Sequence, residues 1–423
     1  MRSVQAHKEV TLANALVPDP VRMAITDALG LLAAEEVQAA SAVPGFAMAA
    51  IDGYAVRSVD VGGTRAIVGS HGDTAENPHP GEVRLPVVGE IPAGSQQPTR
   101  LQPKQAMRVH TGAPLPALAD SVLPLAWSDK GKSFVRPLRP VGTGEFVRGV
   151  GEDINTGDVA VSPGTILGPA QIGLLAAVGR SKVLAYPRPR VSVLSVGKQL
   201  VDIDRTPGRG QVFDINSYAL AAAASDAGAE VRRVGIVEGE PRRIREIIEG
   251  ETIRSELLLI SGAVGGASAQ QIQMILEDLG EIDTTRVAMH PGSVQGCGVL
   301  GSDEVPCILL PDNTVSALVI FEVFVRPMIR AGLGKRPIER RLVKARALGP
   351  LESRVGRRGY IRARLMRDAE TQDYLVEGLS GATGSPAHLL AGLAEANSYI
   401  VIPEEQPDVR PGDVVDVMFL AQG

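Results

Sequence analysis

The chain has 423 residues, of which 44% are hydrophobic and 22% are charged, and its formal net charge at pH 7 is −5. That length exceeds what one hydrophobic core usually serves, so we expect several domains, and the composition argues against wholesale disorder. The acidic balance argues against a general nucleic-acid binder. Since no apolar run has the length of a membrane span, we expect a cytoplasmic protein that meets a membrane only through a partner.

The first part of the chain changes its pattern twice. Apolar residues recur at three- and four-residue steps over residues 21–37, which predicts a helix. Short β-type runs between Gly- and Pro-rich turns then predict an all-β unit over residues 46–148. Helical periodicity returns over residues 166–183. We therefore expect a helical domain, residues 1–45 with 149–185, that carries an inserted β domain.

The middle of the chain, residues 186–334, alternates predicted strands and helices. The strands are expected at 191–196, 230–237, 257–260 and 307–310, and the helices at 216–227, 241–249, 268–279 and 315–331. Repeated βα units of this kind predict a doubly wound, parallel α/β domain.

The last part of the chain, residues 335–423, returns to short apolar runs, at 360–365, 374–377, 399–402 and 414–417. Short strands of this kind predict a C-terminal β-barrel.

Three loop motifs in the first part of the chain place polar side chains where chemistry could occur. Asp52 precedes a glycine at the start of a strand, and Thr111 opens a Pro-rich turn after another strand. Ordinary turns explain both motifs better than a ligand site does when each is taken alone. Asp153 follows Arg148 closely, and these charges either pair across a domain boundary or reach into a cleft.

The α/β region adds two loop motifs at the ends of predicted strands. Residues 261–266 combine a strand end, a Gly-rich loop and the start of a helix, a combination that can hold an anion. The loop fits neither the Walker A nor the Rossmann fingerprint, and simple chain reversal explains it equally well. Residues 290–292 and 311–316 also follow strands, where open α/β sheets bind ligands, although ordinary turns fit as well.

The order of these motifs is more specific than any one of them. Asp-Gly-Tyr-Ala-Val, Thr-Gly-Ala-Pro-Leu-Pro, Gly-Glu-Asp, Ser-Gly-Ala-Val, Pro-Gly and Leu-Pro-x-Asn-x-Val-Ser-Ala follow one another along the chain. In this order the sequence resembles the MoeA and gephyrin E-domain family over roughly residues 10–420. The resemblance implies an elongated homodimer with its active cleft between subunits. It also implies transfer of molybdate onto adenylylated molybdopterin, with Mg²⁺ and release of AMP.

The resemblance also implies roles for individual residues, with no protein ligand assigned to a metal. The catalytic set is Asp52, Thr111, Asp153, Arg286 and His290. The set expected to bind molybdopterin is Ser261, Gly262, Gly265, Gly266, Pro291, Gly292, Pro311, Asn313 and Ser316.

Several positions depart from the family pattern, and most of them lose a charge, whereas Arg286 keeps the charge but not the geometry and Asp312 adds a negative charge. Acidic residues expected by the resemblance are replaced by Lys198, Gln199, Gly239 and Gln270, two lysines are replaced by Arg286 and His290, and a glycine is replaced by Asp312. Carboxylates are the ligands that Mg²⁺ prefers, and a histidine is mostly neutral at pH 7 unless its pKa is shifted. These changes predict a weakened catalytic cleft and make the binding of Mg²⁺ and molybdopterin doubtful.

Two functions follow from the resemblance. The first is a gephyrin-like dimeric scaffold that binds a short peptide tail of a membrane receptor or of a cytoskeletal or cell-division protein. The second is an active or slow molybdopterin molybdenumtransferase. The lost charges favour the scaffold as the biological role and leave enzymatic activity uncertain.

Overall fold

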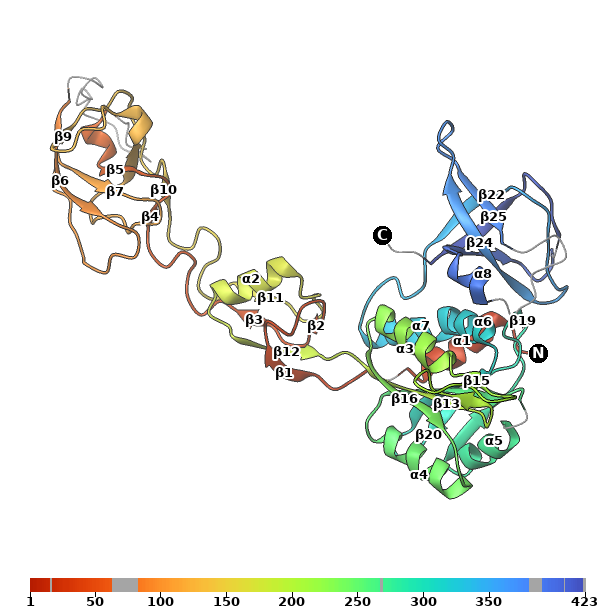
Figure 1. Ribbon diagram of the computed structural model, residues 1–423. Coiled ribbons are helices and arrows are strands. Elements are labelled where there is room, and N and C mark those ends of the chain that lie inside the picture. Colours follow the sequence, from red (N-terminus) through yellow and green to blue (C-terminus); the bar gives the residue numbers. More distant parts are fainter. Residues whose placement is uncertain (16, 63–82, 267–268, 380–389, 407, 421–423) are drawn as a thin grey trace. The chain divides into compact units, whose positions relative to one another are not determined.

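The computed structural model describes residues 1–423 apart from 16, 63–82, 267–268, 380–389, 407 and 421–423. The described chain forms two compact units (Figure 1). One unit is residues 22–184, and the other combines residues 1–21 with residues 185–423. Within the described residues, the helices are too short or too polar to cross a bilayer.

The unit of residues 22–184 is built mostly from short strands. Its largest sheet has the order β8-β5-β7-β6-β9, with β8 Ser121–Pro124, β5 Gly53–Val56, β7 Ala106–Val109, β6 Leu85–Ile91 and β9 Phe134–Val135. The smaller sheets pair β1 Val21–Ala24, β12 Lys182–Tyr186 and β2 Leu32–Ala33, then β3 Val37–Gln38 with β11 Val159–Val161, and β4 Met48–Ala49 with β10 Val147–Arg148. Helix α2 is Pro169–Ala177, and two 3-10 turns are Ser58–Asp60 and Leu125–Trp127.

The helix predicted over residues 21–37 is wrong, because this segment forms β1, β2 and β3. Gly30 takes the left-handed conformation, with φ of 78°, and so interrupts any helix through this segment. Strand β12 lies between β1 and β2 and supplies hydrogen-bond partners that lie far away in the sequence. Tertiary pairing therefore overrides the helical spacing of the apolar residues, and the expected second helix is confined to α2 before β12 begins.

The other unit contains a six-stranded mixed sheet with the order β16-β13-β17-β21-β20-β18. These strands are β16 Glu230–Val237, β13 Arg190–Val196, β17 Leu257–Val264, β21 Val305–Pro311, β20 Gly296–Leu300 and β18 Gly280–Asp283. The four neighbouring strands β16, β13, β17 and β21 run parallel to one another, as predicted. Strands β20 and β18 run antiparallel at the far edge and were not predicted.

Helices cover both faces of this sheet (Figure 1). They are α1 Val4–Ala13, α3 Asn216–Ala227, α4 Pro241–Thr252, α5 Ala269–Glu277, α6 Thr314–Ile320 and α7 Arg326–Gly332, with a π-helical turn Phe321–Val325 between α6 and α7. Leu257 and Leu259 enter the core under α1, α3, α6 and α7, while Leu258 and Ile260 enter the core under α4 and α5. This alternation is why β17 reads as a continuous apolar run. The predicted start of α5 at residue 268 lies outside the described residues.

The C-terminal region of the same unit is a closed five-stranded barrel, in agreement with the sequence. Its strands are β22 Leu342–Ala347, β24 Arg358–Arg367, β25 Tyr374–Gly378, β26 Ser398–Ile402 and β28 Val414–Phe419. Strand β24 pairs with both β25 and β26, which closes the ring through β22 and β28. Shorter elements flank it, namely β23 Leu351–Glu352, β27 Asp408–Val409 and helix α8 Leu390–Ala394.

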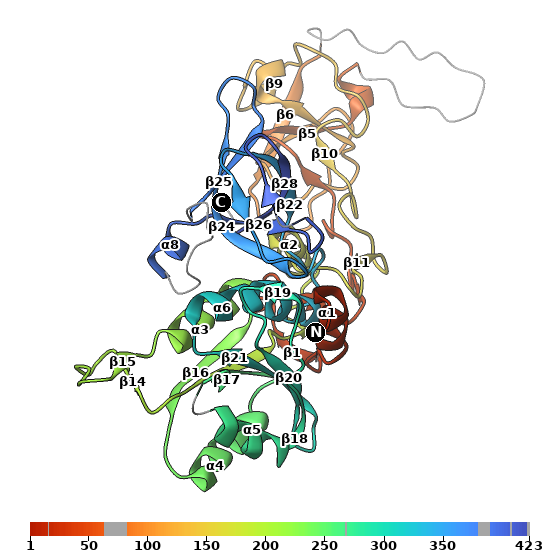
Figure 2. The ribbon, with the colours of Figure 1, turned by 90° about the vertical axis from the view of Figure 1, so that its right-hand side faces the viewer.

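Two short elements position functional loops. Strand β19, Met289–His290, pairs in parallel with the start of β24, so the α/β region and the barrel share a hydrogen-bonded ladder. The pair β14 Leu200–Val201 and β15 Val212–Phe213 follows β13 in the chain and projects away from the sheet (Figure 2). Strand β19 overlaps a motif that the sequence analysis interpreted as a loop, and no strand was predicted over residues 200–213.

Candidate functional site

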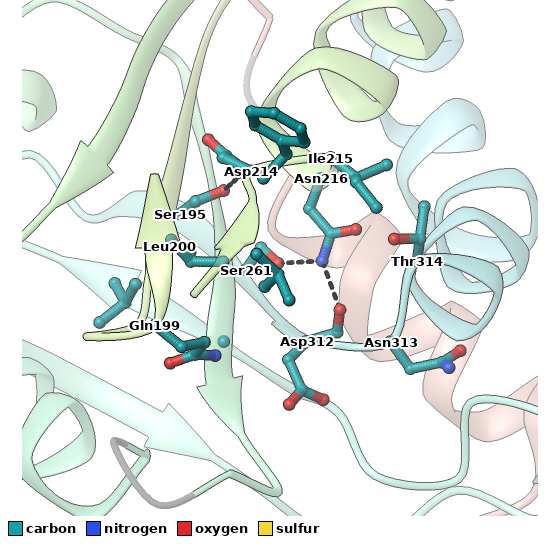
Figure 3. Close-up of a pocket in the computed structure, with 14 residues that line it drawn as sticks. Ser195, Gln199, Leu200, Asp214, Ile215, Asn216, Ser261, Asp312, Asn313 and Thr314 are labelled. Carbon is teal, nitrogen blue, oxygen red and sulfur yellow. Dashed lines mark hydrogen bonds between the residues drawn. The ribbon is translucent and has the colours of Figure 1, made fainter. Parts of the chain in front are cut away.

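A polar pocket lies where β13, β17 and β21 end and α3 and α6 begin. Its volume is about 260 Å³, and its lining residues are Ser195, Val196, Gln199, Leu200, Val212, Phe213, Asp214, Ile215, Asn216, Ser261, Gly262, Asp312, Asn313 and Thr314. The carboxyl ends of parallel strands are the usual place for a ligand in an open α/β sheet. The pocket therefore lies where the fold class predicts it (Figure 3).

Asn216, the first residue of α3, ties the ends of β17 and β21 together. Its amide nitrogen donates to the Ser261 hydroxyl at 2.5 Å and to the Asp312 carbonyl at 2.9 Å. The Asp312 carbonyl can only accept, so the amide orientation is fixed with Nδ2 on this side. The Asn216 side-chain oxygen is buried and has no hydrogen-bond partner among the described residues. Asn216 thus connects the start of α3 to the ends of β17 and β21. Its side-chain oxygen is left as an acceptor without a hydrogen-bond partner among the described residues.

Asp214 holds the opposite wall of the pocket. Its carboxylate accepts the Ser195 hydroxyl at 2.8 Å and the Ser217 backbone N–H at 3.1 Å. The Ser217 hydroxyl donates to the other carboxylate oxygen. Asp214 is fully buried, and a buried carboxylate needs several donors of this kind. Sequence reasoning missed Asp214, although an acidic residue two positions before Asn216, at the start of a helix, was a usable signal.

The glycine loop after Ser261 is needed for close packing as well as for its turn. Gly262 has φ of 78°, and a Cβ added there would lie 2.1 Å from the Val196 carbonyl oxygen. Gly265 also has positive φ, of 77°, and a Cβ on Gly266 would lie 3.8 Å from a carboxylate oxygen of Asp312. Ser261 and Gly262 line the pocket. Gly262 is buried and contributes backbone without a side chain to the pocket wall.

The loop between β21 and α6 supplies the third wall. Pro311 ends β21, and the Asn313 side chain accepts the Ser316 N–H at 2.9 Å as the N-cap of α6. Asn313 therefore has a structural role in addition to lining the pocket. The Asp312 side chain points away from the amide of Asn216 (Figure 3). It places a carboxylate on the pocket where the resemblance expects a glycine.

The segment 289–292 lies at the junction of the α/β region and the barrel. His290 stands opposite Gly359 of β24 in the parallel ladder, and Gly292 packs so closely that an added Cβ would lie 2.9 Å from Ile320 of α6. Burial lowers the pKa of His290 below its ordinary value, and the positive charges of Arg354 and Arg357 lower it further. The lowered pKa favours the neutral form of His290 at neutral pH.

Two buried serine hydroxyls near this junction have no hydrogen-bond partner among the described residues. The Ser293 and Ser353 hydroxyl oxygens are buried and lack hydrogen-bond partners among the described residues. A Cβ added at Gly359 would lie 2.3 Å from the Ser353 hydroxyl, so that hydroxyl lies over the residue opposite His290. Sequence reasoning named His290 but missed Arg354 and Arg357, because only the pairing of β19 with β24 brings the barrel to this segment.

Asp52 and Thr111 meet in the unit of residues 22–184. The Asp52 carboxylate accepts the Thr111 backbone N–H at 2.8 Å and the Thr111 hydroxyl at 2.9 Å. These two donors hold the pKa of Asp52 below its ordinary value, and the charges of His110 and Arg108 act in the same direction. Asp52 is exposed and is a carboxylate at neutral pH. The two residues that the sequence could only suggest separately are therefore direct partners.

Asp153 and Arg286 have simpler surroundings. Asp153 forms an ion pair with Arg148, as one of the two sequence interpretations expected, but both residues belong to one compact unit rather than to two domains. Arg286 is exposed, and its backbone carbonyl accepts the Arg2 N–H at 2.8 Å. Neither side chain lines the polar pocket.

The part of the chain that the structure describes offers the expected Mg²⁺ no dedicated set of ligands. Among the described residues, no three His, Cys, Asp or Glu side chains gather closely enough to hold a metal ion. The pocket carries the carboxylates of Asp214 and Asp312, and Asp214 is committed to the Ser195 and Ser217 hydroxyls. Mg²⁺ usually keeps several waters and is bound through one or two carboxylates together with substrate phosphates, so the carboxylate of Asp312 could contribute to such a site but does not form one by itself.

Three family models match successive parts of the chain. They describe the MoeA N-terminal region (domain I and II) over residues 2–179, a probable molybdopterin binding domain over residues 192–331, and the MoeA C-terminal region (domain IV) over residues 344–420. The pocket and the segment 289–292 fall within the second match.

Curated relatives match from end to end. Molybdopterin molybdenumtransferase 1 of Mycobacterium tuberculosis is 56% identical over 427 residues, and the alignment covers 100% of both chains. Molybdopterin molybdenumtransferase 2 of the same organism is 34% identical and covers 99% of this chain and 100% of the relative. A solved structure, the molybdopterin biosynthesis MoeA protein from Pyrococcus horikoshii, has a TM-score of 0.78 at 28% identity and covers 100% of this chain and 99% of that chain.

Proposed function

Because the chain belongs to the MoeA family of molybdopterin molybdenumtransferases, we propose that it transfers molybdenum to molybdopterin in the biosynthesis of the molybdenum cofactor. The observation that carries this proposal is the 56% identity, over the full length of both chains, to a relative named for that activity. The finer proposal is the reaction that the sequence resemblance implies, in which adenylylated molybdopterin takes up molybdate and AMP is released.

The polar pocket is the proposed site of the pterin substrate. It combines hydroxyl, amide and carboxylate groups with the backbone of Gly262, which suits a heterocycle rich in donors and acceptors. The unused side-chain oxygen of Asn216 and the carboxylate of Asp312 are acceptors. They are matched to N–H groups of the ligand rather than to its phosphates.

The junction around His290 is the proposed site of the molybdate oxyanion. We call His290, Arg354 and Arg357 the oxyanion cluster. Arginine guanidinium groups bind tetrahedral oxyanions through charge-assisted hydrogen bonds, and the Ser293 and Ser353 hydroxyls are further donors without partners. This cluster supports anion binding even though the lysines expected from the resemblance are absent.

Asp52 has the proposed role of a charged acceptor. Its pKa is lowered by the Thr111 donors, so it is ionised at neutral pH and can accept a hydrogen bond or a proton but cannot donate one. Thr111 keeps the carboxylate in one orientation through two hydrogen bonds. We further propose a homodimer with the active cleft between subunits, as the resemblance implies; light scattering of the purified protein tests it.

The peptide-binding scaffold receives less support than the enzyme. The full-length relatives are named as molybdenumtransferases, so the comparisons favour the transferase, which was the second function expected from the sequence. The weakened cleft was inferred from lost acids and lysines, yet the oxyanion cluster contains two arginines that this inference did not consider. The scaffold role stays a prediction.

The test is complementation of a bacterial strain that lacks its own molybdenumtransferase. The wild-type gene should restore the activity of a molybdenum enzyme such as nitrate reductase, and purified protein should release AMP from adenylylated molybdopterin only when molybdate is present. The variant Asp52→Asn should restore less activity, because it removes the charge that Thr111 stabilises. A wild-type protein that is folded and expressed but restores nothing overturns the proposal.

A further inference from the structure

The strands β14 and β15 and the loop between them form an arm, residues 199–213, that supplies one wall of the polar pocket. Among the described residues these two strands pair only with each other. The arm lines the pocket through Gln199, Leu200, Val212 and Phe213, and it projects away from the sheet (Figure 2). A two-stranded pair of this size is not stable by itself, so contacts at its base decide where the arm lies.

Asp202, which follows β14 directly, anchors the base of the arm. Its carboxylate accepts the hydroxyl of Tyr218 in α3 at 2.6 Å, and both terminal nitrogens of Arg233 in β16 donate to it at 3.3 Å. The Arg233 guanidinium also stacks on the Tyr218 ring, 4.0 Å from its centroid. Since stacking holds a planar guanidinium in one orientation, α3 and β16 together fix the carboxylate of the arm.

The same guanidinium also reaches the hydrogen bonds around a buried pocket residue. Arg233 Nη1 donates to the Ser217 hydroxyl at 3.1 Å, and that hydroxyl donates in turn to the Asp214 carboxylate. Asp214 is buried, lines the pocket and accepts the Ser195 hydroxyl as well (Figure 3). A hydroxyl that accepts from a cation is polarised towards the acceptor behind it. One side chain therefore contacts both the arm and the donors that hold Asp214.

The backbone of β16 is irregular where it presents Arg233. The residue opposite Arg233 is Val193 of β13, and the next residue of β13 lies opposite Gly235. Val234 is thus an extra residue in β16, and a bulge of this kind re-aims the side chains beside it. Gly235 has φ of 82°, and an added Cβ would lie 3.1 Å from the Arg233 guanidinium. The bulge and the glycine leave the space that the guanidinium occupies.

We propose that Arg233 is a positioning residue for the pterin pocket, which holds the arm through Asp202 and the Asp214 carboxylate through Ser217 before the substrate binds. This inference rests on the proposed function for the identity of the ligand. A substrate that meets an arm already in place does not have to order it, so the contact favours binding and leaves the chemical step unchanged.

The first experiment compares hydrogen exchange in Arg233→Met with exchange in Arg232→Met, a matched control. Arg232 is the neighbouring residue of β16 and pairs at 3.1 Å with Glu251, which does not line the pocket, so the control also loses an ion pair. The reporters are the N–H groups of Val212 and Asp214, which donate to carbonyls at the start of the arm at 2.8 and 2.9 Å. Exchange at both should rise by about tenfold in Arg233→Met, which loses hydrogen bonds to two partners, and should stay unchanged in the control.

The second experiment is steady-state release of AMP, with adenylylated molybdopterin varied at saturating molybdate. Arg233→Met should raise KM by about threefold to tenfold, because a smaller fraction of the protein has the arm in place, and kcat should stay within about twofold. Asp202→Asn keeps the shape of the side chain but loses its charge, so it should act in the same direction. The double variant should be no worse than Arg233→Met alone, since both changes remove one shared contact.

The outcomes separate this inference from the proposed function. Unchanged exchange at both amides in Arg233→Met, or an equal rise in KM in Arg232→Met, overturns the inference and leaves the transferase proposal intact. Faster exchange with an unchanged KM also overturns it, because the arm is then held without consequence for the substrate. If the wild-type protein releases no AMP, the transferase proposal fails together with the role of the arm in pterin binding, while exchange measured without substrate still decides whether Arg233 holds the arm.

Discussion

Replacing Gly262 by alanine should destabilise the α/β region more than replacing a glycine of the same region that has open space around it. Gly262 follows Ser261 in β17, has φ of 78°, and lies against the neighbouring strand β13. A Cβ added there would be 2.1 Å from the Val196 carbonyl oxygen, which is a backbone atom that cannot rotate away. The variant must therefore shift the end of β13, which is one wall of the pocket.

The stability that Gly262→Ala is expected to lose has two contributions, and a matched control variant separates them. A left-handed conformation costs a residue with a Cβ about 1–2 kcal/mol, and forcing extra volume into a packed interior costs about 1–3 kcal/mol. Gly210 has a similar φ of 83°, but an added Cβ would meet no atom within 4 Å. Gly210→Ala should therefore show only the conformational part, and Gly262→Ala should lose about 1–3 kcal/mol more.

Urea unfolding followed by circular dichroism, together with hydrogen exchange of the β17 amides, measures this difference. The single tryptophan, Trp127, belongs to the other compact unit. Its fluorescence should report the same unfolding midpoint in both variants and so serves as an internal control. If Gly262→Ala and Gly210→Ala lose the same stability, the close approach of Gly262 to Val196 does not exist and the reasoning fails.

Three further changes test buried charges. Arg340→Met should lower the free energy of unfolding by about 3–5 kcal/mol, because it removes the closest cation from a largely buried Glu322. The control Arg242→Met, at an exposed ion pair, should cost less than about 1 kcal/mol. Equal urea midpoints for the two variants would refute this difference. His7 is buried and its pKa is lowered to about 4 from an ordinary value of 6.5. The unfolded chain therefore binds the proton first, so stability is full above pH 6.5 and is lost as the pH falls towards 4, and His7→Gln should remove this part of the pH dependence in thermal melts. Ser192→Ala should cost about 1–3 kcal/mol in urea unfolding, because the buried carboxylate that accepts its hydroxyl at 2.6 Å loses a donor, and an unchanged midpoint would contradict that role.

The strands of the α/β region could be predicted because their surroundings are uniform. Every residue of β17 is buried, so the run from residue 257 is apolar whichever face a side chain enters. The end of helix α3 could be predicted as well, because Gly228 terminates it in the left-handed conformation, with φ of 107°. In both cases the local sequence and the tertiary environment favour the same structure.

The segment of residues 21–37 shows where local patterns fail. Its apolar spacing fits a helix, yet its backbone pairs with β12, which lies about 150 residues further along the chain. A local sequence pattern therefore cannot reveal that the segment pairs with β12. Strands β14, β15 and β19 escaped prediction for a related reason, since each has two residues and gains its partner from elsewhere.

The sequence by itself determined the family and the alternation of strands and helices in the α/β region, because these follow from motif order and from apolar periodicity. Of the residues that it predicted to bind the pterin, Ser261, Gly262 and Asn313 line the polar pocket. Only the tertiary structure decided which side chains share a site. Thr111 meets Asp52, Asn216 joins Ser261 to Asp312, and the barrel brings two arginines to His290. The physical reason is that charge and hydrogen bonding act over a few ångströms, whereas the residues concerned are separated by tens of positions and meet only when the strands pair.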